Sequence, residues 1–408
     1  MNVLVLNGGS SSLKAVLRDL PEGALPDDPP APLWEANVDW GRHSGRAQIR
    51  VRRGSEPARE SDIAIQSSDE VLRPLIESIW SGPTPALGGP EEIRVVGHRV
   101  VHGGKAFRDT ARITPDVRAG IRKYCEFAPE HNRLELEAIE IAEAIFGPAV
   151  PQVAVFDTAF HATMPVAAQV YAGPYDWYEK GIRRYGFHGI SHQYAWQRTA
   201  KILGGDQSRL RLVSCHLGNG ASLAAILGGK SVDTTMGFTP LEGLMMGTRS
   251  GSIDPGILIY LVRHLDYRAD ELDRLLNRES GLKGVSGISG DMRDILAAIE
   301  KGDGRARLAF DVYAHRVCRE IGGMVTSLGG IDVLLFTAGI GENCPPLRAA
   351  VCERLAFLGV KLDAVANAHP RMDSDIAGAG SRVRVLVIHA DEDWQVAREC
   401  HRLLAASS

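Results

Sequence analysis

The spacing of apolar residues along the first half of the chain changes from the pattern of strands to the pattern of helices. Apolar runs flank a short polar turn within residues 5–17, and alternating runs follow at Leu33–Val38 and Ala47–Val51, which predicts a meander of three or four strands. Helical spacing begins at Asp69–Trp80. The elements expected next are a strand at Ile93–Val96, helices near 115–127 and 134–146, and a strand at Gln152–Phe156. Strands followed by alternating strands and helices indicate a mixed-sheet α/β domain.

The second half of the chain repeats this order of elements. Its expected elements are strands at Leu210–Cys215, Ser222–Leu227 and Ser231–Thr234, helices near 255–278 and 292–328, and a strand at Asp332–Phe336. A strand at Val383–Ile388 and helical spacing at Glu392–Leu404 end the chain, and this last helix is a candidate to pack back on the first domain. The pattern therefore predicts a duplicated α/β unit.

One glycine-rich segment occurs in both halves. Residues 5–17 and 215–227 carry the same residue at five equivalent positions, among them a glycine and a serine of the turn region. Each copy predicts two strands joined by a tight turn whose exposed N–H groups could surround an anion. Either copy alone would more often be an ordinary hairpin, but the repeat in register favours a duplicated phosphate-binding unit. The copies differ at Lys14, which offers a cation in the first, and at Asn219, which lies in the turn of the second.

Composition limits the class of protein and its partners. A length of 408 residues suits two domains, and 44% hydrophobic with 24% charged residues is typical of soluble globular proteins. A net charge of −4 and a pI near 6.4 argue against nucleic acid and membrane partners. With no signal-like start and no apolar run of about 18 residues, we expect a cytoplasmic location. The six cysteines form no CxxC pair and are expected to be buried free thiols.

The segment 332–343 is a candidate nucleotide cradle. An apolar run there ends in Gly339 and Gly341 and precedes a helix that begins after Cys344. A buried strand that opens through glycines into a helix N-terminus commonly holds phosphates. A purely structural tight turn is an equally good interpretation of this segment taken alone.

A second candidate is the loop-like segment 238–255, in which Arg249 stands among small residues. Such an arginine could contact the oxygens of a phosphoryl group. The alternative is a structural ion pair with Glu242 or Asp254.

Three further polar clusters lie in apolar surroundings, at residues 97–104, 155–161 and 184–192. A single buried histidine in such a setting is usually a hydrogen-bonded structural residue. Because the clusters place an arginine, an aspartate and a histidine at strand ends or glycine turns, we expect them to converge on one cleft.

Taken together, these segments make the chain resemble the acetate kinase family, within the superfamily of acetate and sugar kinases, heat-shock chaperone ATPases and actin. The resemblance covers nearly the whole chain. It rests on seven motifs in order, at residues 7–14, 97–104, 156–161, 185–189, 216–220, 236–251 and 337–343.

The resemblance implies a fold and a reaction. The fold is α/β, with two duplicated ribonuclease-H-like (actin-like ATPase) domains and a central cleft. The N-terminal domain would comprise residues 1–158 plus 391–408, and the C-terminal, ATP-binding domain residues 159–390. The expected enzyme is a homodimeric acetate kinase that transfers the γ-phosphoryl group of ATP reversibly to acetate, with Mg²⁺, or Mn²⁺ in its place, and gives acetyl phosphate and ADP.

The resemblance also implies roles for individual residues. The catalytic residues would be Arg99, Asp157, His188 and Arg249. The metal would be held by Asn7 and Glu392. ATP would be bound by Ser10, Ser12, Lys14, His216, Leu217, Gly218, Asn219, Gly220, Asp291, Met292, Arg293, Gly339, Ile340, Gly341, Glu342 and Asn343. The carboxylate substrate would contact Arg99, Val101, His131, Phe187 and Pro240.

The chemistry of the reaction agrees with these roles. Phosphoryl transfer needs in-line positioning and cations on the transferring oxygens rather than covalent catalysis. A carboxylate is already ionised at neutral pH, so Asp157 need not act as a general base, and we expect it to orient the metal or Arg99. Closure of the two domains would exclude water from the transfer.

One departure from the family pattern bears on the acceptor. The family usually reads Ala-Pro-Leu-His-Asn-Pro where this chain has Ala128–Arg133, so Glu130 replaces a leucine that helps line the methyl pocket. A carboxylate in that pocket would repel an anionic substrate or point away from it. Propionate or another short-chain carboxylate is therefore an alternative acceptor. A sugar or polyol kinase that uses Asp157 as a general base, and an ATP-gated switch protein, are the competing interpretations of the chain as a whole.

Overall fold

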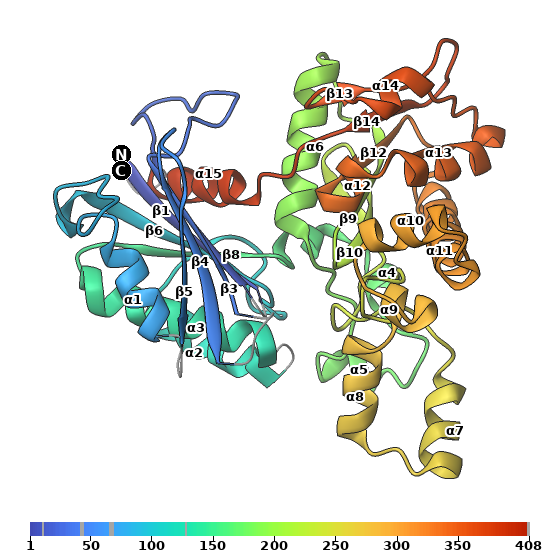
Figure 1. Cartoon of the computed structure of the whole chain (residues 1–408), viewed down its shortest axis with the longest axis horizontal. Coiled ribbons are helices and arrows are strands. Elements are labelled where there is room, and N and C mark those ends of the chain that lie inside the picture. Colours follow the sequence, from blue (N-terminus) through green and yellow to red (C-terminus); the bar gives the residue numbers. More distant parts are fainter. Residues whose placement is uncertain (10–11, 41–44, 65–68, 127–128, 406–408) are drawn as a thin grey trace. The chain divides into compact units, whose positions relative to one another are not determined.

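The computed structural model describes residues 1–408 except 10–11, 41–44, 65–68, 127–128 and 406–408, and the side chains of residues 126 and 129–131 are likewise outside the described part. The chain divides into two compact units (Figure 1). Unit 1 comprises residues 1–159 and 391–408, and unit 2 comprises residues 160–390.

Unit 1 is built on an eight-stranded mixed sheet in the order β5-β4-β3-β2-β1-β6-β8-β7. The first five strands form an antiparallel meander, and β6 and β8 continue parallel to β1. The strands are β1 (Asn2–Gly8), β2 (Ser12–Asp19), β3 (Trp34–Asp39), β4 (Arg46–Arg53), β5 (Arg59–Ala64), β6 (Ile93–Val100), β7 (Ala111–Arg112) and β8 (Gln152–Phe156). The helices are α1 (Asp69–Glu77), α2 (Pro115–Lys123), α3 (Pro129–Phe146) and α15 (Glu392–Ala405).

Helices lie on both faces of this sheet. Because side chains alternate along a strand, neighbouring residues of β1 point to opposite faces. Asn7 donates to Asp393 on α15, whereas a methyl group at Gly8 would contact Glu135 on α3. The main apolar core of unit 1 combines buried residues of β1–β3 with those of α1 and α3. Each face of the central strands is therefore covered by a different helix.

Unit 2 is built on a six-stranded sheet in the order β11-β10-β9-β12-β14-β13. Its strands are β9 (Arg211–Leu217), β10 (Ala221–Leu227), β11 (Lys230–Thr234), β12 (Val333–Thr337), β13 (Ser374–Asp375) and β14 (Arg384–Val387). Its helices are α4 (Val166–Gln169), α5 (Asp176–Glu179), α6 (Gly189–Leu203), α7 (Pro255–Leu265), α8 (Ala269–Arg278), α9 (Gly281–Ser286), α10 (Met292–Glu300), α11 (Gly304–Leu328), α12 (Ala338–Asn343), α13 (Pro345–Arg354) and α14 (Ala364–Ala368).

The two sheets share one central topology, which confirms the predicted duplication. In each, an antiparallel hairpin and a third strand are followed by two strands parallel to the first, so that β3-β2-β1-β6-β8 corresponds to β11-β10-β9-β12-β14. The long helix between β8 and β9 in sequence, α6, packs on β9 in unit 2, whereas the helix that follows β14, α15, packs on β1 and β6 in unit 1. The predicted return of the last helix to the first domain is thus confirmed.

Several element boundaries differ from those expected. The helical stretches 255–278 and 292–328 are each divided in two, because Asp266 adopts a left-handed conformation after α7 and Gly302 does so after α10. The helix expected near 115–127 ends at Lys123. The strand β5 was not predicted, because four of its six residues are polar and its pattern lacks apolar alternation.

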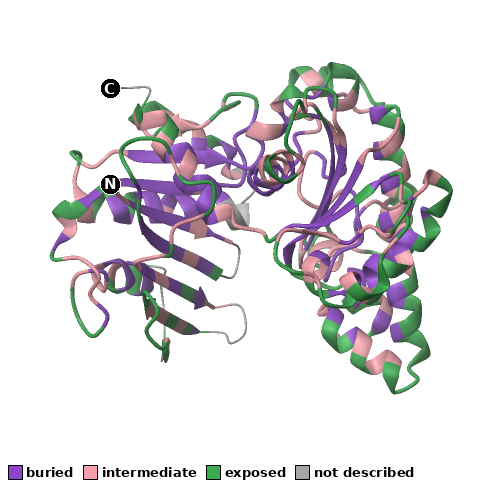
Figure 2. Cartoon of the chain, turned by 90° about the horizontal axis from the view of Figure 1, so that it is seen from above, coloured by how far each residue is buried: buried purple, intermediate pink, exposed green. Residues whose placement is uncertain are grey.

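The central strands of both sheets are buried. Figure 2 shows that buried residues follow these strands, while exposed residues gather on the outer helices and on the outer strands of unit 1. Within the described ranges, all six cysteines are free, as predicted, but only four of them are buried, since Cys125 and Cys318 are partly exposed. No described helix is both long enough and apolar enough to cross a membrane.

His98 is a buried polar residue in the core of unit 1. It is 1% exposed, and its Nε2 atom lies 2.7 Å from Oε1 of Gln152 on the neighbouring strand. Gln152 in turn donates to the backbone oxygen of Ile139 in α3. Burial lowers the pKa of His98 to about 4, because the folded protein disfavours its charged form.

We therefore predict that His98 contributes to acid sensitivity. The unfolded chain binds a proton at this side chain near pH 6.5 and the folded chain only near pH 4, so the free energy of unfolding falls as pH is lowered through this window. In the non-titrating variant His98→Gln, the free energy of unfolding should fall by up to about 3 kcal/mol less over the same pH window. Urea denaturation across the window would measure it, with exposed His264→Gln as the control. An unchanged pH slope in His98→Gln would contradict the prediction.

Candidate functional site

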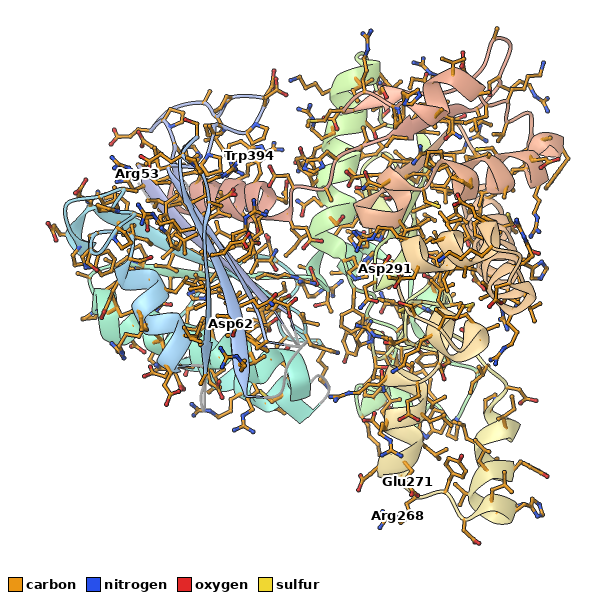
Figure 3. The ribbon with its side chains drawn as sticks, in the orientation of Figure 1. Arg53, Asp62, Arg268, Glu271, Asp291 and Trp394 are labelled. Carbon is orange, nitrogen blue, oxygen red and sulfur yellow. The ribbon has the colours of Figure 1, made fainter. Side chains whose placement is uncertain are left out.

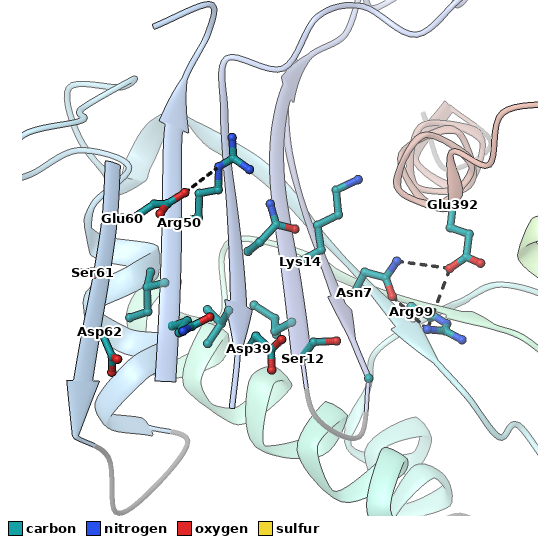
Figure 4. A pocket seen from close by; sticks show the side chains of 16 residues that line it. Asn7, Ser12, Lys14, Asp39, Arg50, Glu60, Ser61, Asp62, Arg99 and Glu392 are labelled. Carbon is teal, nitrogen blue, oxygen red and sulfur yellow. Dashed lines mark hydrogen bonds and ion pairs between the residues drawn. The ribbon is translucent and has the colours of Figure 1, made fainter. Parts of the chain in front are cut away.

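Arg99 is the centre of a polar cluster in unit 1. Its side chain is 15% exposed, and its Nε and Nη2 atoms donate to Oδ2 of Asp157 at 3.1 and 2.7 Å. Nη1 donates to Oδ1 of Asn7 at 3.2 Å and lies 4.0 Å from Oε2 of Glu392. Asp157, Asn7 and Glu392 thus hold the guanidinium in one orientation, and Figure 4 shows Asn7 and Glu392 beside it.

The topology explains why these four residues meet. Asn7 and Arg99 lie near the ends of the parallel strands β1 and β6, and Asp157 directly follows β8. Because the carboxyl ends of parallel strands share one edge of a sheet, the three side chains are brought together there. Glu392 reaches the same edge as the first residue of α15.

The charges of the cluster are strongly coupled. Burial alone would lower the pKa of Arg99, but the carboxylates of Asp157 and Glu392 outweigh it and raise that pKa. Asp157 is only 1% exposed. Arg99 therefore stays charged at any physiological pH, although most of its surface is removed from water.

The β1–β2 hairpin contributes a second cation. Lys14 pairs opposite Asn7 in the hairpin register and forms an ion pair with Asp393 of α15. Burial would lower the pKa of Lys14, but Asp393, Asp391 and Glu35 together raise it. Its side chain is still 44% exposed, so it remains accessible to an anion.

The Arg99 cluster and the β1–β2 hairpin border one pocket of about 760 Å³ (Figure 4). It is lined at one end by Asn7, Ser12, Lys14, Arg99 and Glu392, all of them predicted site residues. Strands β3, β4 and β5 supply the other end of the pocket with polar side chains, of which Arg50 and Glu60 form an ion pair. The structure thus brings the unit 1 part of the predicted site together.

Asn7 and Glu392 fit the requirements of Mg²⁺. Oδ1 of Asn7 and the carboxylate of Glu392 are oxygen donors on adjoining side chains, with Nδ2 of Asn7 3.4 Å from Oε2 of Glu392. The described residues contain no group of three or more histidine, cysteine, aspartate or glutamate side chains able to hold a metal by themselves. Mg²⁺ usually binds through one or two carboxylates together with waters and substrate phosphates, which such a sparse donor set matches.

His188 occupies a special backbone position in unit 2. It precedes α6 in a left-handed conformation with φ 56°, which few residues other than glycine adopt. Its Nδ1 atom lies 2.9 Å from Oγ of Ser222, and its ring stacks on that of His216 at 4.1 Å between centroids. His216 is held in turn by Oγ of Ser191 at 2.7 Å. The ring of His188 is therefore fixed by contacts on both sides.

Arg249 lies beside His188 over the turn of the second hairpin. A methyl group added at Gly220 would be 3.5 Å from Nη1 of Arg249 and equally far from the His188 ring. Nη1 of Arg249 also donates to the backbone oxygen of Pro240 at 2.9 Å. Of the two carboxylates considered as partners of Arg249, Glu242 binds Arg184 and Tyr171, and Asp254 caps α7.

A second pocket, of about 520 Å³, lies wholly within unit 2. Asp291, labelled in Figure 3, borders it at the start of α10, where its Oδ1 atom accepts from the backbone N–H of Arg293. Eight of the predicted ATP-binding residues line this pocket: Gly218, Asn219, Asp291, Met292, Arg293, Gly339, Ile340 and Asn343. The predicted glycine segment after β12 is helical at once, as α12, rather than an open turn leading to a later helix.

Some predicted residues lie elsewhere. Glu342 binds Nδ1 of His389 at 2.8 Å and the backbone N–H of Ala390 at 2.9 Å, away from the lining of this pocket. His216, Leu217, Gly220 and Gly341 are also absent from that lining.

The predicted substrate contacts are divided between the two units. Arg99 and Val101 belong to unit 1, whereas Phe187 and Pro240 belong to unit 2. Ser10 lies outside the described residues, as do the side chains of Glu130 and His131.

Two residues of the site were missed from the sequence. Asp393 binds both Lys14 and Asn7, and its place in the acidic run 391–393 was a usable signal. Glu135 lies beneath the Arg99 cluster with 2% exposure, and nothing distinguishes it from the other glutamates of its helix in the sequence.

Comparisons with known proteins agree with this geometry. The sequence profile of the Acetokinase family matches residues 2–398. The chain is 57% identical over 400 residues to the acetate kinase of Gloeobacter violaceus, across 98% of each protein. Its structure resembles the crystal structure of Porphyromonas gingivalis acetate kinase, with a TM-score of 0.89 and 38% identity over 99% of both chains. It also resembles a propionate kinase from Francisella tularensis, with a TM-score of 0.87 and 36% identity over 98% of both chains.

A family profile that spans almost the whole chain, a relative of this identity and a matching fold agree with the order of motifs in the sequence. The chain therefore belongs to the Acetokinase family, whose fold is that of the actin-like ATPases and whose enzymes are kinases that phosphorylate a carboxylate.

Proposed function

We propose that this protein transfers the γ-phosphoryl group of ATP reversibly to acetate, which gives acetyl phosphate and ADP. The observation that carries the proposal is the Arg99 guanidinium, which is permanently charged, largely buried and fixed by Asp157 and Asn7 at the edge of a pocket. A planar guanidinium matches the geometry of a carboxylate better than any other side chain. Arg99 would therefore bind and orient the acceptor.

The nucleotide would be bound by unit 2. The glycine segments at Gly218 and Gly339 and the start of α10 line its pocket, and glycines and a helix N-terminus suit the binding of phosphates. Ser12 and Lys14 of unit 1 would contact phosphate oxygens. This division matches the proposed domains, residues 1–158 plus 391–408 for the acceptor and 159–390 for ATP.

The transferring group would be stabilised by charge. His188 and Arg249 are held next to one another and would place hydrogen-bond donors on the equatorial oxygens of the phosphoryl group. Mg²⁺, or Mn²⁺ in its place, held by Asn7 and Glu392, would neutralise phosphate charge when bound. No covalent help from the protein is needed, because the acceptor carboxylate is itself the nucleophile.

Asp157 would act through Arg99. Its Oδ2 atom accepts two hydrogen bonds from the guanidinium, which fixes the plane in which the acceptor must bind. An ionised carboxylic acid needs no general base, so the role of Asp157 is to position Arg99 and to balance its charge. Two further parts of the proposal are a homodimer, which rests on the family resemblance, and a cytoplasmic location, which rests on the pattern of the sequence.

Propionate is the second candidate acceptor. A propionate kinase is among the proteins whose structures resemble this one. Glu130 also stands where the family carries an apolar residue in the pocket for the substrate methyl group. Both acceptors would use the same cation, so they differ only in the apolar contacts of the alkyl group.

The first test is acyl-phosphate formation, trapped as hydroxamate, from ATP, Mg²⁺ and acetate. We expect Arg99→Lys to lower kcat/KM for acetate by roughly 10²-fold, because a lysine keeps the charge but loses the bidentate geometry. Arg122→Lys, on the exposed surface of α2, is the matched control. If the native chain turns over ATP without any dependence on a carboxylate, a nucleotide-switch function replaces the proposal.

Asp157→Asn distinguishes positioning of Arg99 from an effect on the metal. We expect kcat/KM for acetate to fall by roughly 10²-fold, because the amide keeps the size of the side chain but removes the charge that fixes the guanidinium. The Mg²⁺ dependence of the remaining activity should stay unchanged. Near-normal turnover would refute this role, and a raised Mg²⁺ requirement would assign Asp157 to the metal instead.

Glu130→Leu tests the acceptor pocket. If Glu130 faces the substrate, the variant should improve kcat/KM for acetate and propionate several-fold, since it removes a negative charge from the pocket of an anion. Parallel assays with acetate, propionate and butyrate would rank the acceptors of both proteins. Identical rankings and rates in the two proteins would show that Glu130 points away from the acceptor.

A further inference from the structure

Glu135 is a buried carboxyl group that the proposed reaction does not use. It lies on α3 with 2% exposure, and both of its oxygens accept from the backbone N–H of Val101, at 3.1 and 3.0 Å. A methyl group at Gly8 would lie 3.7 Å from Cγ of Glu135, so the side chain passes directly beneath the end of β1. Glu135 thus reaches from the helix layer to the strand end that carries Arg99.

The segment that follows β6 is held almost entirely by side chains. The backbone N–H of Val101 donates to Glu135, that of His102 to Oδ1 of Asn132, and that of Gly103 to Oγ1 of Thr158. Asn132 also donates to the backbone oxygen of His102 at 3.0 Å. Beyond the end of the sheet, these bonds take the place of the ladder of hydrogen bonds. Two of the three anchors, Asn132 and Glu135, lie one turn apart on α3.

Val101 is the apolar neighbour of Arg99. Val101 directly follows β6, two positions after Arg99, and it is one of the residues that the family resemblance assigns to the acceptor. Val101 is 3% exposed and Arg99 15%. A short carboxylate held by the guanidinium would bring its alkyl group close to this valine. A small shift of Val101 would therefore change the space left for that group.

The charge of Glu135 also acts on this site. Burial raises its pKa to about 8, a shift that the N–H of Val101 and Arg99 reduce and Asp157 increases. The charged or titratable groups that act on it are Arg99 from β6, Asp157 after β8 and Cys125 from the turn after α2. At neutral pH the carboxyl is mostly protonated, which leaves the positive potential of Arg99 available to an anionic acceptor.

We propose that Glu135 is a positioning residue that sets the size of the acceptor, because it holds the backbone of Val101 and with it the apolar surface beside Arg99. This inference rests on the proposed carboxylate kinase activity. Glu135 does not contact the acceptor, and it acts through Val101. The helix α3 thereby links the acceptor pocket to the core of unit 1.

The test compares Glu135→Asp, Glu135→Gln and Glu140→Gln. Aspartate keeps the carboxyl group but is one methylene shorter and cannot reach Val101, whereas glutamine keeps an acceptor oxygen at the right place. Glu140 lies on the exposed face of the same helix, where it pairs with Arg122, and serves as the control. For each protein, kcat and KM are measured with acetate, propionate and butyrate, together with the KM for ATP.

We expect Glu135→Asp to change the ratio of kcat/KM between acetate and propionate by roughly 4-fold, the effect of burying one methylene differently. The KM for ATP should not change, and Glu135→Gln should restore the native ratio. A uniform loss for all acceptors in Glu135→Asp, or an unchanged ratio, would overturn the inference. If the native chain forms no acyl phosphate from any acceptor, it is the proposed function that fails.

A second measurement does not depend on the folding of Glu135→Asp. As pH rises through about 8, the native protein gains a negative charge beneath Arg99, so its KM for acetate should rise relative to that of Glu135→Gln. The protein with Glu140→Gln should follow the native profile. Parallel profiles for the native protein and Glu135→Gln would show that Glu135 has no influence on the acceptor site.

Discussion

A nearly buried guanidinium has to be balanced by negative charge and still remain available to an anion, and the architecture of unit 1 follows from this requirement. Arg99 is held by Asp157 and Asn7, which come from the two strands on either side of its own. The contacts exist only in one register of the three parallel strands. A shift of one residue in β6 would turn Arg99 toward α3, where Val100 packs in an apolar cluster. The register of the parallel strands therefore determines where the charge of Arg99 lies.

The last helix of the chain completes this arrangement. α15 follows the final strand of unit 2 in sequence but packs on β1 and β6 of unit 1, where Glu392 and Asp393 meet Asn7 and Lys14. In the same way α6, which follows the last long strand of unit 1, packs on β9, and its first turn follows His188. Each duplicated sheet thus receives its last helix from the other half of the sequence. Loss of the terminal helix would remove Asp393, the ion-pair partner of Lys14, and Glu392, the second carboxylate beside Arg99.

Much of this arrangement could be predicted from the sequence, because most site residues belong to glycine-rich or strongly apolar motifs. Lys14 belongs to the predicted hairpin, and Arg99 and Asp157 follow predicted strands; the structure places them at one sheet edge or its hairpin. The strand β5 could not be predicted, because its exposed polar residues carry no periodicity. Glu135 was missed for another reason. In the sequence it is one of several glutamates on a helix. Its burial becomes visible only in the structure, where the end of β1 packs against it.

Positive φ angles at residues other than glycine are the feature that local sequence patterns predict least well. His188 and Ala338 both adopt left-handed conformations, with φ of 56° and 66°, immediately before or at the start of α6 and α12. For residues other than glycine this conformation costs about 1 kcal/mol or more, so it persists only where surrounding contacts enforce it. At His188 those contacts are Ser222 and the stacked His216. The same contacts that keep the strained backbone also fix the imidazole beside Arg249. A relaxed backbone at this position would turn the ring away, so the strain and the placement of the two side chains are maintained by a single set of interactions.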